Sequence, residues 1–506
     1  MNGRWTWIII TFIILLGFLV RTYQVTTSPE GLYIDETSIG YNAYSLLKTG
    51  RDEHGKAWPV FFEAFGEYKL PVYVYSVYLT QLVLGPIDLS VRLPAVIFGA
   101  LTIPALFGLV YELGKRVKDN AFKITPYLSA FLLAISPWHF QFTHAGFEAS
   151  SAIFFLTLGS WLLLLGLRKR NLIKLILAAV SFTATFYAYN SARIVTPVVI
   201  LGLLLTFKKE IQIKQTMVFL SLFIFLSLPF AKFALSPAGL ARAQQVTIFY
   251  NKDDQKPWVT FVTNFWRNIA PETLFLQGEP TIAHLTSHRM SLLYPIELPF
   301  LVIGIIYLFR KKIWGILLWL IIGFVPPAIT TLNPHALRAS LVIPATVMTS
   351  ALGFGVMLSR IRRVGLIRSG IGIYVAILLA LGLRFLTIYH TQYAVDAGWD
   401  WQVGIKRASV VLKKLEPDYS RIYITEAGAG KIAYWWYLKI DPRLLWQTPE
   451  RFAAGKYIFG SEPINHAGKT LYVTSNQVSK AKLLHEIDYP NGAQALNIYQ
   501  LDGETR

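Results

Sequence analysis

The chain has 506 residues, of which 54% are hydrophobic and only 15% are charged, and its mean hydropathy is +0.45. Soluble domains carry about 25% charged residues, so this composition excludes an ordinary soluble protein and indicates a polytopic membrane protein. The absence of cysteine excludes disulfides, thiolate metal sites and a cysteine nucleophile.

The first apolar segment, residues 5–20, is expected to be a retained signal anchor, because no small-residue cleavage site follows it. Further apolar runs have the character of membrane spans, although some are shorter than the roughly 20 residues that a bilayer core requires. They lie at 91–113, 124–138, 147–167, 171–188, 192–207, 216–235, 292–310, 313–332, 338–358 and 367–389.

The basic residues predict the topology. Lys and Arg crowd into short loops that hold only two acids, Asp119 and Glu210, and such loops stay in the cytoplasm. These loops are 115–123, 168–174, 208–214, 310–312 and 360–368. The net charge of +19 is therefore explained mostly by these cytoplasmic loops, and nucleic acid is not expected as a partner.

One apolar run, residues 70–86, does not fit the alternation of inner and outer loops if it crosses the membrane. We expect it to lie in the outer interface, where its tyrosines suit the lipid headgroups. Eleven spans remain, with the N-terminus inside and the C-terminus outside. The protein is thus predicted to sit in the plasma membrane, with its large polar segments on the extracytoplasmic side.

The first outer loop contains two groups of acids. Asp35 and Glu36 precede a stretch in helical register, so Asp35 could cap that helix or serve as a base for a substrate that arrives from outside. Residues 52–55, DEHG, could ligate a divalent ion, but adjacent side chains rarely converge on one ion, and a polar turn explains them as well.

Two further groups lie at the mouths of predicted spans. Glu67 and Lys69 stand where the chain returns to the interface, and Lys69 could meet headgroups or a lipid phosphate. The segments 136–150 and 331–340 each carry a histidine and a second ionisable group. Arg338 opens the span 338–358, where it could anchor the interface or pair with an anion such as a phosphate.

The tail after residue 390 has normal polarity and short hydrophobic runs. Residues 399–415 have helical periodicity, and strands are expected at 421–425, 457–460, 470–475 and 495–501. We therefore predict two domains, a membrane domain over residues 1–389 and a small extracytoplasmic α/β domain over residues 390–506.

Several stretches together resemble the GT-C superfamily of membrane glycosyltransferases. The nearest likeness is to dolichyl-phosphate-mannose protein mannosyltransferases and to the aminoarabinose transferase of lipid A. The resemblance rests on IDETSIGYNAYSLLKTG, EYKLPVYVY and SVRLPAVIFGALTIPALFGLVYELGKR, and on the SP…H…F turn near residue 136. It covers roughly residues 1–390 and implies a GT-C-like fold with about eleven spans and outer interfacial helices.

The resemblance also implies roles for particular residues. Asp35 takes the place of the catalytic base with Glu36 beside it, and Lys69 takes the place of the lysine that meets the donor phosphate. Arg338 and His335 are further candidates for the phosphate. Tyr68, His144 and Glu148 are candidates for substrate binding or for a metal ion. Glu148 lacks the second acid that a metal site needs, so no cofactor is assigned and a divalent metal is left open.

The activity implied is transfer of a sugar from a polyprenyl-phosphate donor to an acceptor hydroxyl, with inversion at the anomeric centre. The acceptor class is open between glycolipid, polymer and protein, and membrane lipids are expected partners. Two other classes remain as alternatives, a transporter or flippase of lipid-linked substrates and a non-catalytic scaffold that presents the tail. A transporter would place its polar groups near the bilayer midplane, whereas here they gather on the outer side.

Overall fold

The computed structural model describes residues 3–251, 254–279, 290–426, 430–448, 452–461, 469–479 and 481–501. Internal contacts divide the chain into two units. Unit 1 consists of Met1–Tyr23, Gly66–Val72 and Pro94–Leu386, and unit 2 consists of Gln24–Phe65, Tyr73–Leu93 and Thr387–Arg506. The first outer loop thus groups with the tail. The predicted domain boundary after residue 389 stays a prediction.

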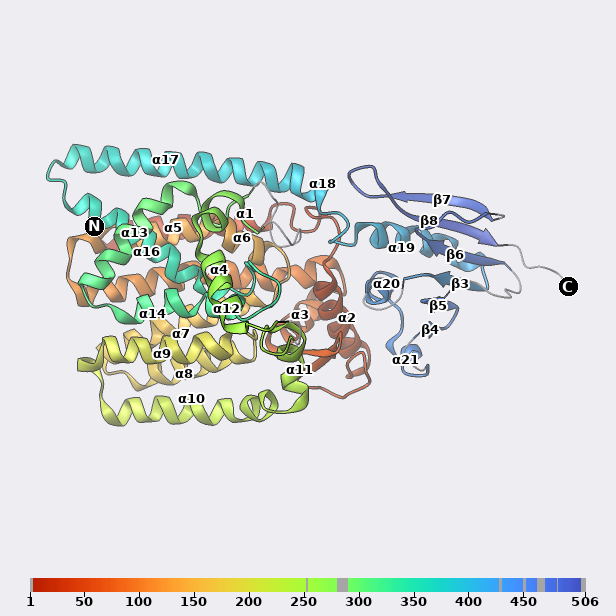
Figure 1. Cartoon of the computed structure of the whole chain (residues 1–506), viewed down its shortest axis with the longest axis horizontal. Coiled ribbons are helices and arrows are strands. Elements are labelled where there is room, and N and C mark those ends of the chain that lie inside the picture. The colour runs from red at the N-terminus through yellow and green to blue at the C-terminus, as the bar shows by residue number, and fades with distance from the viewer. Residues whose placement is uncertain are drawn as a thin grey trace. The chain divides into compact units, whose positions relative to one another are not determined.

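Unit 1 is a helical bundle whose long members lie side by side, with α10 along one edge and α17 along the opposite edge (Figure 1). Its longest helices are α1 (Gly3–Thr22), α4 (Asp88–Val117, entering unit 1 at Pro94), α7 (Ala149–Lys169), α10 (Ile213–Ala234), α16 (Ile343–Ser359) and α17 (Val364–Ile388). By length and composition, six helices among the described residues are apolar enough to cross a membrane, each including or overlapping one of these.

Shorter helices complete the bundle. They are α5 (Thr125–Ile135), α6 (Pro137–His144), α8 (Leu172–Phe186), α9 (Ala192–Thr206), α11 (Pro237–Val246), α12 (Pro257–Ile269), α13 (Leu298–Arg310), α14 (Trp314–Ile322) and α15 (Val325–Ala328). Short helical turns lie at η1 (Asn120–Lys123), η2 (Lys208–Glu210), η3 (Glu272–Gln277), η4 (Pro295–Glu297) and η5 (Ser340–Val342), and strand β2 (Glu67–Lys69) also belongs here. Helices suit a bilayer core, because their backbone N–H and C=O groups are hydrogen-bonded within the helix.

Two predicted spans are divided where the sequence breaks the helix. The run 124–138 ends at Ile135, because the Ser136 hydroxyl caps a new helix, α6, by accepting the backbone N–H of His139. The expected outer turn at 139–146 is therefore mostly helix. The run 313–332 breaks between α14 and α15 beside Pro326 and Pro327, which lack a backbone N–H.

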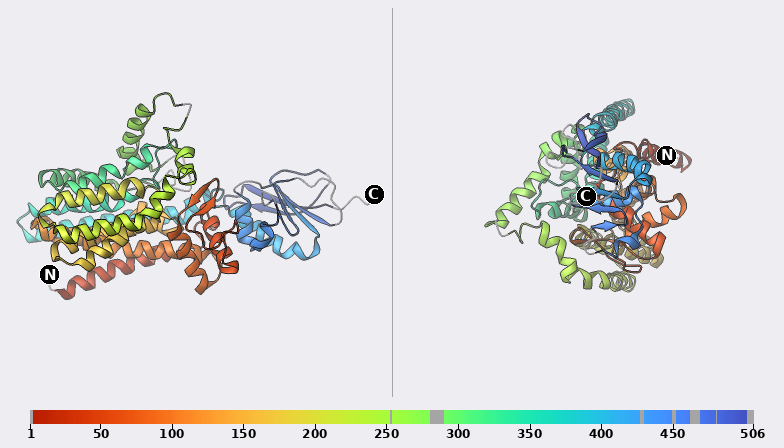
Figure 2. Two further views of the ribbon diagram at one scale, coloured as in Figure 1. Left: turned by 90° about the horizontal axis from the view of Figure 1, so that it is seen from below. Right: turned by 90° about the vertical axis from the view of Figure 1, so that its right-hand side faces the viewer.

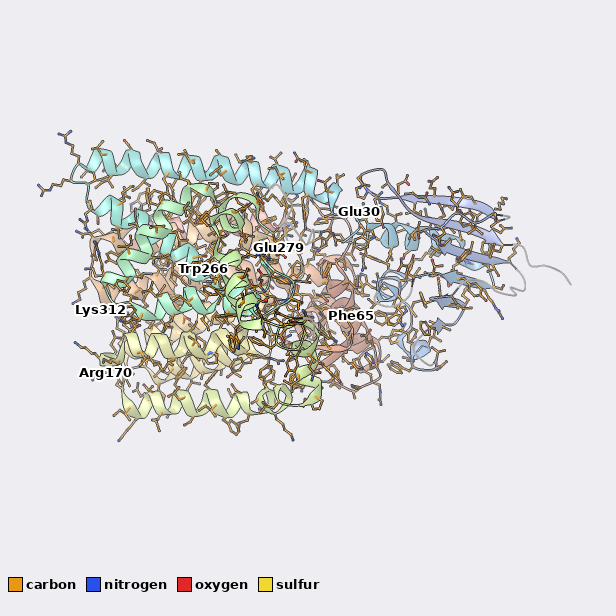
Figure 3. The ribbon with its side chains drawn as sticks, in the orientation of Figure 1. Glu30, Phe65, Arg170, Trp266, Glu279 and Lys312 are labelled. Atoms are coloured by element: carbon orange, nitrogen blue, oxygen red, sulfur yellow. The ribbon has the colours of Figure 1, made fainter. Side chains whose placement is uncertain are left out.

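Ion pairs join the basic loops at one end of unit 1. Arg116 Nη2 lies 2.8 Å from Glu210 Oε2, and Lys311 Nζ lies 3.3 Å from Asp119 Oδ2. Figure 3 shows Arg170 and Lys312 at this same end. The loops that the charge pattern assigned to one side of the membrane thus meet in space. Both acids of these loops serve as partners for the surrounding cations.

Unit 2 combines a six-stranded sheet with helices. The strand order is β4-β5-β3-β6-β8-β7, in which β5, β3 and β6 are parallel and the outer pairs are antiparallel. The strands are β3 (Arg421–Ile424), β4 (Ala453–Ala454), β5 (Tyr457–Phe459), β6 (Thr470–Thr474), β7 (Lys482–Asp488) and β8 (Gln494–Leu501), with β1 (Phe62–Ala64) elsewhere in the unit. The predicted α/β tail is confirmed.

Helices cover one face of this sheet (Figure 2). They include α19 (Val403–Leu415) and α20 (Lys431–Leu438), accompanied by α18 (Ala394–Asp396), α21 (Pro442–Leu445), η6 (Tyr389–Tyr393) and η7 (Glu416–Asp418). The first-loop helix α2 (Ile34–Thr49) packs on α20, and the Tyr41 hydroxyl donates a hydrogen bond of 3.0 Å to the carbonyl of Ile440. Buried Trp435 and Trp436 form the centre of this packing.

Helix α3 (Pro71–Leu84) belongs almost wholly to unit 2, which receives it from Tyr73 onward. Tyr73 is fully buried and its hydroxyl donates to the carbonyl of Val91, 2.9 Å away. The run 70–86 therefore contributes to the first-loop packing instead of the bundle of long helices. The interfacial placement of the run 70–86 stays a prediction.

The topology can be tested with single cysteines, because the chain has none of its own. We expect Lys118→Cys to react with a membrane-impermeant thiol reagent only after the membrane is permeabilised, since the basic loops stay in the cytoplasm. Asp418→Cys in the exposed tail serves as the control and should react without permeabilisation. Labelling of Lys118→Cys from outside would overturn the eleven-span topology.

Candidate functional site: a buried charged cluster in unit 1

Lys69 lies between two carboxylates. It ends β2 and is only 6% exposed, and its Nζ lies 3.7 Å from Glu67 Oε1 and 3.8 Å from Glu148 Oε1. Strand alternation places Glu67 and Lys69 on the same side of β2, while Glu148 comes from the residue before α7. Glu67, Lys69 and Glu148 thus lie together in the structure.

A second cation reaches the same carboxylate from α11. Arg242 Nη1 lies 2.5 Å from Glu67 Oε2, so Glu67 holds Lys69 and Arg242 on its two oxygens. The loop is also held nearby, because Gln245 Nε2 donates to the carbonyl of Gly66 at 3.0 Å. Helix α11 therefore fixes the position of β2 and adds a positive charge to it.

Arg338 is buried without a full set of hydrogen-bond partners. Its side chain is 8% exposed, and its Nη1 has no hydrogen-bond partner among the described residues. Its backbone is held, since the Ser191 hydroxyl donates to the carbonyl of Arg338 at 3.0 Å. Burial and then repulsion by Arg242 lower the pKa of Arg338 to about 10, so it remains charged at neutral pH.

Electrostatic interactions place Arg338 in the same group as Lys69. Arg338 interacts electrostatically with Glu67, which is the carboxylate that Lys69 contacts. Tyr189 interacts electrostatically with both Arg338 and Glu148. Burial raises the pKa of Tyr189 to about 12. We call these residues the charged cluster of unit 1, comprising Glu67, Lys69, Glu148, Tyr189, Arg242, Glu279 and Arg338.

Glu279 is the acid nearest the Arg338 turn. It is fully buried, and its Oε2 accepts the backbone N–H of Ala336 at 2.6 Å. Burial raises the pKa of Glu279 to about 8, although the backbone N–H of Ala336 and the charge of Arg338 lower it. The charged cluster thus combines three cations, Lys69, Arg242 and Arg338, with three acids, and the Nη1 of buried Arg338 has no hydrogen-bond partner among the described residues. Such a cluster is suited to bind an anion.

Asp35 and Glu36 lie in unit 2. Helix α2 begins at Ile34 with Tyr33 as its N-cap, so the expectation that the helix begins after Asp35 is wrong. The reason is Glu36, whose Oε2 accepts the backbone N–H of Tyr33 at 2.8 Å and so starts the helix earlier. Asp35 is half-buried in the first turn, where the helix dipole favours a negative charge.

Glu36 is held by a buried arginine. Arg92 Nε and Nη2 lie 2.9 and 3.1 Å from the two Glu36 oxygens, and neither side chain is exposed. Arg92 also donates to three backbone carbonyls, those of Val25, Pro29 and Gly31. This bidentate pair fixes the first turn of α2 and with it the position of Asp35. The roles proposed for Asp35 and Glu36 in catalysis stay predictions.

The other candidates have separate surroundings. His144 is fully buried, with Nδ1 3.0 Å from the carbonyl oxygen of Arg21 and its ring stacked on Phe140. The Tyr68 ring packs edge-on against Phe233, and the backbone N–H of His335 donates to Asn268 Oδ1 at 3.2 Å. The substrate roles of His144, Tyr68 and His335 stay predictions.

The second acidic group forms a tight turn. Asp52 Oδ1 accepts the backbone N–H groups of His54 and Lys56 at 2.9 and 2.8 Å, which is the polar-turn interpretation of DEHG. Glu148, the acid suggested for a metal, already lies beside the Lys69 ammonium. In the part of the chain that the structure describes, no three His, Asp or Glu residues gather as a metal site. The described residues thus offer no ligand set for a divalent ion, and we derive no step through one.

Four members of these groups were not predicted from the sequence, and only one of them stands in a sequence pattern that could have indicated its role. Arg92 lies within an apolar segment, where an ionisable residue is expected to have a partner. Tyr189, Arg242 and Glu279 are isolated in loops or in a short helix, and only the tertiary fold brings them to Lys69 and Arg338.

The Arg92–Glu36 pair gives a test of stability. Arg92→Met leaves a buried carboxylate without its partner, which typically costs about 3–5 kcal/mol, so we expect a clear loss of thermal stability of the purified protein. Adding Glu36→Gln to Arg92→Met removes the unpaired charge and should restore part of that stability. Arg421→Met, at an exposed strand end, is the control. Equal stability of Arg92→Met and wild type would contradict the pair's role in holding α2.

No protein-family model and no curated protein sequence matches this chain. Among solved structures it is similar to ArnT from Cupriavidus metallidurans bound to undecaprenyl phosphate, with 11% identity and a TM-score of 0.56 over 99% of this chain and 98% of that one. It is also similar to the oligosaccharyltransferase AglB from Archaeoglobus fulgidus in complex with an inhibitory peptide and a dolichol-phosphate. There the identity is 12% and the TM-score 0.55, over 86% of this chain and 63% of AglB.

The apo form of the Archaeoglobus fulgidus oligosaccharyltransferase is similar at 15% identity and a TM-score of 0.53, over 86% of this chain and 64% of that one. The chain thus spans less than two thirds of the oligosaccharyltransferases that it matches. These likenesses show that it has the fold of the GT-C membrane glycosyltransferases, as the sequence motifs predicted.

Proposed function

We propose that the protein is a membrane glycosyltransferase that moves a sugar from a polyprenyl-phosphate donor to an acceptor hydroxyl at the outer face of the plasma membrane. The observation that carries the proposal is the charged cluster of unit 1, in which buried Arg338 lies with Lys69 and Arg242 and its Nη1 has no hydrogen-bond partner among the described residues. The GT-C fold and the lipid phosphates bound by ArnT and AglB support it. The acceptor is a glycolipid, a polymer or a protein.

In the proposed mechanism the cluster binds the donor phosphate. Lys69, Arg338 and the neighbouring Arg242 neutralise the negative charge that develops as the phosphate leaves. Binding of the phosphate would also provide Arg338 Nη1 with an acceptor. Burial raises the pKa of Glu279 to about 8, and in its neutral form this acid can donate a hydrogen bond to the phosphate, which an ionised acid would repel.

Asp35 is the proposed general base. The acceptor oxygen attacks the anomeric carbon, its proton passes to the Asp35 carboxylate, and the bond between that carbon and the phosphate oxygen breaks. Direct displacement inverts the anomeric centre and needs no covalent sugar–enzyme intermediate. The Arg92–Glu36 pair would contribute by positioning Asp35, because it holds the first turn of α2.

The location of the cluster favours transfer over transport. Figure 3 shows Glu279 away from the end of unit 1 that carries Arg170 and Lys312. A transporter is expected to place its substrate groups near the midplane between inner and outer gates. A site displaced from the basic end suits a reaction on the outer side.

The proposal is tested by incubating the purified protein with polyprenyl-phosphate sugars and following release of polyprenyl phosphate. We expect Asp35→Asn to lower turnover by about 10²–10⁴-fold, because the amide cannot accept the acceptor's proton. The fold should survive, since the substitution keeps the shape of the side chain. Near-normal transfer by Asp35→Asn would remove Asp35 as the base and leave it as a favourable charge at the start of α2.

The phosphate ligands give an independent prediction. Charged hydrogen bonds contribute about 1.5–3 kcal/mol each, so Lys69→Ala or Arg338→Ala should lower turnover roughly ten- to a hundredfold. Lys232→Ala, an exposed cation near the end of α10, is the matched control and should retain wild-type turnover. If all three variants behave alike, the cluster does not bind the donor phosphate.

A further inference from the structure

Helix α12 (Pro257–Ile269) presents a stripe of apolar side chains to its surroundings. Trp258, Val262 and Trp266 recur every four residues and therefore lie on one face, and they are 71%, 51% and 63% exposed. The Phe249 ring, itself partly exposed, packs on Trp258 with ring centroids 5.0 Å apart and extends the stripe. In a water-soluble protein this face would be buried.

The opposite face of α12 is polar and buried. Asn264 Nδ2 donates to the carbonyls of Ala328 and Thr330 at 3.3 and 3.1 Å, and Asn268 Oδ1 accepts the backbone N–H of His335. Both asparagines are less than 5% exposed. The side-chain amides of α12 therefore bind the segment that leads to Arg338. The aromatic side chains of the helix face away from that segment.

The direction of α12 identifies what covers the apolar stripe. The helix runs crosswise to the long helices of unit 1, as the two views show (Figures 1 and 2). Since those helices cross the bilayer, α12 runs along the membrane plane. Tryptophan is enriched at the headgroup level, and Lys256 and Arg267 at the two ends of α12 suit lipid phosphates.

We propose that α12 is a membrane-docking helix whose aromatic stripe inserts into the outer leaflet, and that this contact holds the segment 328–338 through Asn264 and Asn268. The occupant of the stripe is the bilayer. The consequence for donor binding, through Arg338, rests on the proposed function, whereas the lipid contact and the ordering of the segment do not.

The lipid contact is tested with Val262→Cys, labelled with an environment-sensitive fluorophore in nanodiscs of phosphatidylcholine and phosphatidylglycerol. Nitroxide attached high on the acyl chains should quench most of the fluorescence, because an interfacial helix lies at the boundary of headgroups and chains. The same label at Asp418→Cys, in the exposed tail, is the control and should keep its fluorescence. Absence of quenching at position 262, as when a second copy covers the stripe, would overturn the proposal.

The link to Arg338 is tested by hydrogen exchange of residues 331–338 in the same nanodiscs. Replacing Trp258 and Trp266 together by serine should weaken docking and cause loss of amide protection in this segment. The control is Trp7→Ser, which removes an exposed tryptophan of α1 and should leave the protection unchanged. Unchanged protection in the double variant would refute the link. Neither readout depends on turnover, so failure of the transfer assay alone would count against the proposed function and not against this inference.

Discussion

A charged side chain removed from water must be compensated by hydrogen bonds or by an opposite charge, and this constraint organises the protein. Arg21 and Arg92 are both fully buried and both are compensated. Arg21 donates to three carbonyls and to Thr143 and lies 2.7 Å from His139 Nδ1, which ties α1 to α5 and α6. Arg92 ties the start of α4 to the first loop.

Arg338 differs from these two arginines. Its guanidinium is nearly as buried, yet its Nη1 has no acceptor in the described residues, and burial raises the pKa of Glu279, the acid that interacts with it. A buried cation that is left uncompensated costs stability, and proteins tolerate such costs where a ligand supplies the missing partner. This contrast between satisfied and unsatisfied arginines separates the residues that hold the fold from those that we assign to the donor phosphate.

Much of the fold could be predicted because it depends on properties that act locally along the chain. Hydropathy locates the helices of unit 1, and the distribution of Lys and Arg groups the loops that Arg116 and Lys311 join. Four strands of the tail were also found. Strands β4 and β7 were not, because β4 has only two residues and the side chains of β7 are mostly exposed and show no clear alternation. The early start of α2 depends on Glu36 and Arg92, which are 56 residues apart in the chain.

The candidate site was predictable only in part. Lys69 and Glu148 could be proposed because each stands at the mouth of an apolar segment, and the structure places them together. Arg242 and Glu279 could not be, since each is a single charged residue in a long loop region whose position only the folded chain defines. The asparagines of α12 carry no signal for the same reason: Asn264 binds two backbone carbonyls far along the chain, and Asn268 accepts a distant backbone N–H.

The central claim is that the charged cluster of unit 1 binds a lipid phosphate. The most direct measurement compares equilibrium binding of undecaprenyl phosphate and of uncharged undecaprenol to the purified protein. We predict that the phosphate binds at least about tenfold more tightly, in line with one charged hydrogen bond or more, and that Arg338→Met removes the difference. Equal affinity of the wild-type protein for the phosphate and the alcohol would contradict the account.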